Sequence, residues 1–160
     1  MRKISTILSK ICDAINKQIS LFVVLLLFLL SLLLGVNVFY RYVLNDSIYW
    51  SNEVARYLLA YIVFLGATMA HKSGVHIRID MIFMHISQKS IKVIDKVISI
   101  FFILFWALVL YGSIKLFPLF MMQTTATLQI PYAVPFAALP ISAVIWMVYC
   151  LDDLLKKLEA

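Results

Sequence analysis

Charged residues are scarce in this chain: Asp, Glu, Lys and Arg make up 14% of its 160 residues, against about a quarter in an average soluble domain. Hydrophobic residues make up 64%, and the mean hydropathy is +0.99. Because each membrane crossing takes about 20 apolar residues, the chain has room for roughly four or five spans and for no sizeable domain outside the bilayer. The composition therefore excludes an ordinary soluble globular protein.

Cysteine and histidine are also few, and their positions exclude several kinds of site. Cys12 and Cys150 form no CxxC or Cys/His cluster, which argues against a disulfide framework or a zinc site. His71, His76 and His85 lie at the edge of the apolar runs, whereas a haem anchor needs axial ligands inside the bilayer. The spans also lack the side-chain set of an intramembrane protease. We therefore predict no catalytic residue, no cofactor and no metal.

Long apolar runs are what the chain has instead, and they predict an all-α integral membrane protein with a single membrane domain, residues 1–160. The first span carries no carboxylate, which argues against a proton-coupled drug exporter. Pro135 and Pro140 predict a bend in the last span. The four transmembrane helices are predicted at residues 19–40, 50–71, 97–120 and 130–151, with a cytoplasmic-side connector at 75–90.

An N-terminal amphipathic interfacial helix is predicted at residues 4–19. Its isoleucines and leucine recur at helical spacing on one arc, and its lysines lie off that arc. A helix of this kind lies in the headgroup plane, with its apolar side in the acyl boundary and its cations on anionic lipid. The candidate lipid contacts are Lys3, Lys10, Lys17, Ile7 and Ile11.

The basic residues predict the orientation of the chain. The net charge is +6, but the Lys and Arg residues flank apolar runs, which favours lipid headgroups over nucleic acid as their partners. Eleven of the 14 fall on one side of the predicted spans, and only Arg41, Arg56 and Lys115 fall on the other. By the positive-inside rule both termini and the middle connector face the cytoplasm.

Glu53 and Arg56 are the charges inside the second predicted span. They are three residues apart on a helix, so they could pair with each other, and Ala60 and Ala67 continue the same side and allow a close helix approach. One interpretation is a surface packed on a partner or on the first helix near Arg41. The alternative is that both charges only reach the outer headgroups.

Several short motifs between residues 41 and 80 resemble one membrane protein family. The motifs are Arg41-Tyr42-Val43-Leu44, Trp50-Ser51-Asn52-Glu53, Arg56, Phe64-Leu65-Gly66-Ala67 and His76-Ile77-Arg78-Ile79-Asp80. In these motifs the chain resembles the small, DctQ-like membrane subunit of tripartite ATP-independent periplasmic (TRAP) transporters.

The resemblance implies a bacterial inner-membrane scaffold that pairs with a much larger membrane subunit, which carries the substrate and sodium sites and moves as an elevator. A periplasmic binding protein would deliver an organic acid such as sialic acid or a C4-dicarboxylate. Because the chain ends at Ala160, we expect the large subunit to be a separate polypeptide. The partner-interface candidates are Arg41, Trp50, Glu53, Arg56, Ala60, Gly66, Ala67, His76 and Asp80.

Two other functions stay open on the sequence: a small stand-alone membrane carrier and a redox anchor subunit. A scaffold is favoured because the spans hold little intramembrane charge, whereas a carrier needs an ion path. No residue of the chain selects among substrates.

Overall fold

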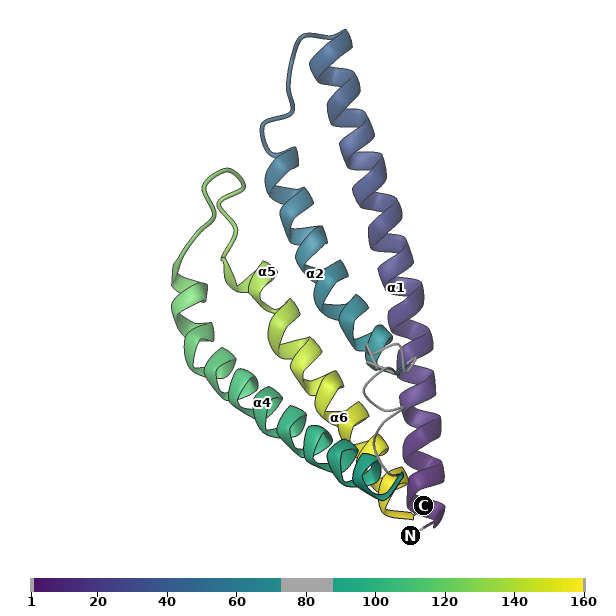
Figure 1. The fold of residues 1–160 in the computed structure, drawn as a ribbon. Helices are drawn as coiled ribbons and strands as arrows, with labels where there is room; N and C mark the ends of the chain where they lie inside the picture. The colour runs from purple at the N-terminus through teal and green to yellow at the C-terminus, as the bar shows by residue number, and fades with distance from the viewer. Residues whose placement is uncertain (1, 73–87, 160) are drawn as a thin grey trace.

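The computed structural model describes residues 2–72 and 88–159, and four long helices dominate it (Figure 1). Four stretches of the described residues are long and apolar enough to cross a membrane: Leu8–Val43, Ser51–Lys72, Val97–Met122 and Ala133–Lys156. The described residues form no β-strand, so the predicted all-α membrane fold is confirmed. The helices are α1 (Arg2–Val43), α2 (Ser51–Lys72), α4 (Gln88–Met122), the short α5 (Ala133–Phe136) and α6 (Ala138–Glu159).

The helices lie side by side in the order α1, α2, α6, α4, and they spread apart toward one end (Figure 1). Both termini lie at the narrow end, which we call the terminal end; the two loops at 44–50 and 123–132 lie at the other, the loop end. In the α5–α6 span, 33% of the residues in an apolar stretch of 18 residues are buried inside the chain, against 11% in the corresponding stretch of each of the other three spans. The last span is therefore the centre of an open layer of helices, and the other three present most of their surface outward.

A single uninterrupted helix replaces the predicted interfacial helix and first span. With 42 residues α1 is about 63 Å long, twice the roughly 30 Å hydrocarbon core. Residues 4–19 are helical as expected, but the expected boundary at Ile19 is absent. The physical reason is that one buried stripe, formed by Cys12, Ile19, Val23 and Leu26, continues through that position at helical spacing.

A proline accompanies an interruption in the fourth span. The fourth span is broken at Ala137, between α5 and α6. Pro140 has no N–H to donate to the carbonyl of Phe136, four residues earlier, and its ring crowds that carbonyl. The bend predicted from Pro135 and Pro140 is thus a break between two helices.

The predicted connector at 75–90 overlaps the start of α4, which begins at Gln88, so its last residues belong to that helix. Residues 75–87 of the connector lie outside the described residues.

Candidate functional site

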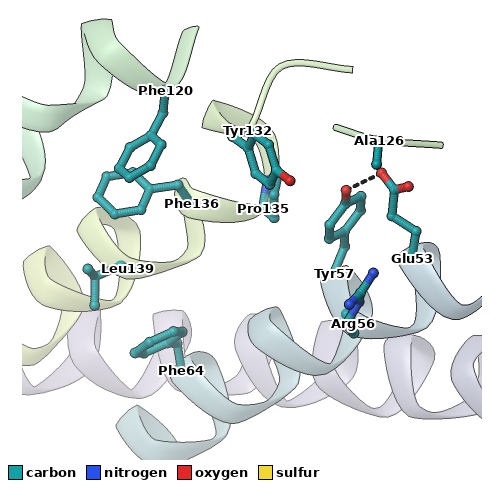
Figure 2. Close-up of a pocket in the computed structure, with 10 residues that line it drawn as sticks. All are labelled: Glu53, Arg56, Tyr57, Phe64, Phe120, Ala126, Tyr132, Pro135, Phe136 and Leu139. Atoms are coloured by element: carbon teal, nitrogen blue, oxygen red, sulfur yellow. Dashed lines mark hydrogen bonds between the residues drawn. The ribbon is translucent and has the colours of Figure 1, made fainter. Parts of the chain in front are cut away.

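The carboxylate of Glu53, in the first turn of α2, organises the loop end. Glu53 is 3% exposed. Its Oε2 accepts a hydrogen bond from the backbone N–H of Thr127 at 2.9 Å, and its Oε1 accepts one from the hydroxyl of Tyr57, one turn along the same helix (Figure 2). Because Thr127 belongs to the loop between α4 and α5, Glu53 ties α2 to that loop. A carboxylate is also favoured electrostatically at a helix N-terminus.

The α4–α5 loop, residues 123–132, is folded on itself by hydrogen bonds. The N–H of Thr125 donates to the carbonyl of Ile130 at 2.8 Å, and the N–H of Ile130 donates to Oγ1 of Thr125 at 3.2 Å. A second link to α2 lies below the first, because the hydroxyl of Tyr61 donates to the carbonyl of Val134 at 2.7 Å. The α4–α5 loop is therefore held on α2 through Thr127, and α5 is held on α2 through Val134.

Glu53 and Arg56 line the same hollow at the loop end, but they differ in their exposure and in their partners. Within residues 2–72 and 88–159 they form no ion pair; Glu53 is covered by the α4–α5 loop, while Arg56 is exposed. A line of exposed residues runs down α2 from this arginine at helical spacing. We call it the outer stripe of α2: Asn52, Arg56, Leu59, Val63, Ala67 and Ala70.

The other predicted interface residues are placed without being tested, because no partner is present. Arg41 is exposed at the end of α1, with its guanidinium 5.7 Å from the ring centroid of Tyr42, and Trp50 is exposed just before α2. Gly66 is half-buried, and a Cβ built on it meets no atom within 4 Å, so the packing of this chain does not require glycine there. Ala60 is half-buried, Ala67 is exposed, and His76 and Asp80 lie outside the described residues.

The predicted lipid contacts on α1 are partly described. Lys10, Lys17 and Ile11 are exposed, which suits contact with a headgroup layer. The side chains of Lys3 and Ile7 lie outside the described part of the chain. In contrast, Ile15 and Ile19 of the same predicted apolar arc pack against α2 and α6, in a cluster with Val23 and Leu65.

A cluster of charges that the sequence interpretation missed joins three helices at the terminal end. The ammonium of Lys72 in α2 lies 3.2 Å from a carboxylate oxygen of Asp13 in α1 and 3.2 Å from Oδ2 of Asp152 in α6. Lys156 approaches the same Oδ2 to 2.7 Å. The side chain of Asp152 is 0% exposed and that of Lys72 is 13% exposed. This cluster fixes the ends of α1, α2 and α6 to one another.

An aromatic and imidazole contact lies beside that cluster. Nε2 of His71 lies 3.3 Å from Asp153, and its ring is 4.3 Å from that of Trp146 between centroids. Trp146 in turn stacks on Trp106 of α4 at 5.2 Å. Cys12 and Cys150 are buried and form no disulfide with each other, and Sγ of Cys150 lies 3.7 Å from Nε2 of His71. Within the described residues no three His, Cys, Asp or Glu side chains lie close enough together to hold a metal ion.

The chain matches the family described as "Tripartite ATP-independent periplasmic transporters, DctQ component" over residues 30–160. It is 31% identical over 107 residues to a protein of Oleidesulfovibrio alaskensis named "Isethionate TRAP transporter permease protein DctMQ", a match that covers 66% of this chain and 17% of the relative.

A second relative, from Haemophilus influenzae, is named "Putative TRAP transporter small permease protein". It is 34% identical over 68 residues, which is 42% of this chain and 42% of the relative. The chain thus matches less than half the length of either relative. The family match, in contrast, spans all four apolar helices, from the middle of α1 to the end of the chain.

Proposed function

Because the chain belongs to the DctQ family of small TRAP-transporter permease components, we propose that it supports a larger, separate permease subunit and does not itself carry substrate. Its family and its four apolar helices make it a multi-pass protein of the inner membrane. The observation that carries the proposal is the family match over residues 30–160, on an open layer of helices whose outer spans leave most of their apolar surface uncovered.

The distribution of buried charge supports a supporting role over a carrying one. A carrier needs polar or ionisable groups along a path through the bilayer. The buried charged side chains of the described residues are Glu53, at the loop end, and Asp152, which lies at the terminal end with the partly buried Lys72. Both sets are engaged in holding the chain's own helices and loop together.

The outer stripe of α2 is the face we assign to the large subunit. In lipid, helices associate where small residues let their backbones approach closely. Gly66 and Ala70 are one turn apart on α2, and the space beside Gly66 is not filled by this chain. Ala67 adds a third small residue, and it belongs with Arg56 to the stripe itself. Arg41 of α1 lines a pocket with Asn52 of the stripe, whereas Trp50 lines a different pocket with Val54 and Leu58. His76 and Asp80 stay interface candidates from the resemblance alone, because they lie outside the described residues.

The transported solute in this proposal is a small organic acid, taken up with sodium after delivery by a periplasmic binding protein, with the large subunit moving as an elevator. Sialic acid and C4-dicarboxylates are candidate solutes from the resemblance. The relative named for isethionate adds a sulfonate to the candidates. Uptake of labelled solutes by cells with and without this chain, at high and low sodium, tests both the solute and the coupling.

Co-purification tests the assigned face. We expect affinity-tagged wild-type chain to recover a large TRAP permease subunit from membranes, and Gly66→Leu to recover much less of it. Because a Cβ at Gly66 meets no atom of this chain, the variant should keep wild-type helicity and yield. Gly112→Leu, in α4, is the matched control, since a Cβ there also meets open space.

Full recovery by Gly66→Leu, or equal loss in both variants, contradicts the placement on α2. Recovery of no permease subunit by the wild-type chain contradicts the proposed function itself.

A further inference from the structure

A cavity of about 470 Å³ lies at the loop end, between α2 and the α4–α5–α6 side of the layer (Figure 2). Its walls come from all four of these helices. Aromatic rings and aliphatic side chains form most of it, including Phe64 from α2 and Phe136 and Leu139 from α5 and α6. The rings of Phe120 and Phe136 lie 4.3 Å apart between centroids. The cavity is thus an apolar slot inside the span region.

The two charged residues that line the cavity differ in what they can still bind. Both carboxylate oxygens of Glu53 already accept hydrogen bonds, from Tyr57 and from the N–H of Thr127. Arg56 is exposed, and within residues 2–72 and 88–159 its guanidinium has no hydrogen bond or ion pair. The cavity therefore offers one cation with free donors and no free anion.

The cation and the apolar wall are arranged along the membrane normal. Phe64 lies about 12 Å deeper along α2 than Arg56, by the rise of the helix. Arg56 stands in the second turn of a spanning helix, and Tyr132, an aromatic residue of the kind found at membrane interfaces, lines the same cavity. A ligand that fits this arrangement has an anionic head at the interface and an apolar tail directed into the bilayer.

We propose that this cavity binds one glycerophospholipid, with its phosphate on the guanidinium of Arg56 and one acyl chain against Phe64, Phe136 and Leu139. An arginine fork makes two parallel charge-assisted hydrogen bonds to a phosphate, which a neutral lipid head cannot match. The inference does not depend on the proposed partner subunit.

Arg56 also borders a second, more open groove of about 690 Å³ on the other side of α2, with Leu30, Leu34, Ala55 and Leu59. We assign the lipid to the first cavity because its walls come from four helices and include several aromatic rings, whereas the second groove is a furrow between α1 and α2. The two placements make different predictions for variants that fill each space.

Native mass spectrometry of the full chain tests the proposal. The chain is purified in mild detergent, stripped of lipid, and mixed with either phosphatidylglycerol or a diacylglycerol with the same acyl chains. We expect one phosphatidylglycerol to stay bound and the diacylglycerol to be lost. Arg56→Gln should lower the affinity for phosphatidylglycerol by about tenfold or more, because the charge-assisted bidentate contact is lost. Arg41→Gln removes another exposed loop-end arginine, which lies outside the cavity, and should leave the retention of phosphatidylglycerol unchanged.

Filling each space separates the two placements. Leu139→Trp, or the milder Leu139→Phe, should block retention while Arg56 is intact, and Ala55→Phe should not. Unchanged helicity by circular dichroism identifies the variants that fold. The proposal is overturned by equal retention of the two lipids, by Arg56→Gln binding like wild type, by Arg41→Gln losing as much as Arg56→Gln, or by Ala55→Phe blocking binding where the Leu139 variants do not.

Discussion

Removal of the Asp152 carboxylate should loosen the terminal end of the protein. Asp152 in α6 is fully buried and accepts hydrogen bonds from Lys72 in α2 and Lys156 one turn further along α6. In Asp152→Ala the ammonium of Lys72 keeps only Asp13, whose side chain is 66% exposed. Loss of one partner from a fully buried ion pair costs about 3–5 kcal/mol. Since Lys72 keeps one partner near the surface, we expect about 2–3 kcal/mol.

The neighbouring carboxylate supplies the control. Asp153 is 40% exposed and pairs with His71, so Asp153→Ala should cost only about 0–1 kcal/mol although it removes the same charge. Replacement of both buried partners, by Asp152→Leu with Lys72→Met, should recover most of the loss, because well-packed apolar groups often match a buried ion pair. Unfolding in a titration with a denaturing detergent, followed by circular dichroism, compares these three variants with the wild-type chain. Equal stability of Asp152→Ala and Asp153→Ala would refute the reasoning.

Three further outcomes follow from the described contacts and the charge pattern. In Glu53→Ala a protease should cleave the α4–α5 loop several times faster than in wild type, because the N–H of Thr127 loses its acceptor. In the control Arg56→Gln the loop should be cleaved at the wild-type rate. Equal cleavage rates in the two variants would show that Glu53 does not hold the loop. In a background without native cysteines, an impermeant thiol reagent should label a cysteine at Ala126 in intact cells and should not label one at Lys17. Both positions are exposed, and the predicted orientation puts Ala126 outside and Lys17 on the cytoplasmic side. The reverse labelling would invert the predicted orientation. Ile11→Asp should reduce recovery of the assembled transporter from membranes, because it places a carboxylate on the exposed lipid side of α1; unchanged recovery would make that contact dispensable.

The sequence predicts the spans well because hydropathy depends on local composition. The second helix was expected at 50–71 and is found at Ser51–Lys72. Helix continuity is harder, because it depends on packing. Residues 4–19 look separate from the first span by their lysines, but Ile19 and Val23 pack on Leu65 of α2, so the packed surface of α1 runs across the expected boundary at Ile19.

The charged contacts between helices could not be predicted from the sequence. Asp13, Lys72 and Asp152 are far apart in the chain, and each taken alone looks like a residue that reaches the headgroups. The same limit explains Glu53, whose nearest charge in sequence is Arg56, while its actual partner is a backbone N–H in a distant loop. The motif that contains Glu53 marked a residue that is buried and hydrogen-bonded within the chain, and its assignment to a partner surface stays a prediction.

Reconstitution of transport tests the central claim most directly, namely that this chain is a necessary subunit that does not carry substrate. Proteoliposomes would contain this chain alone, the large permease subunit alone, or both, each with the periplasmic binding protein, a sodium gradient and a labelled organic acid. We predict uptake only when both membrane subunits are present. Uptake by this chain alone, or full uptake by the large subunit without it, would contradict the account.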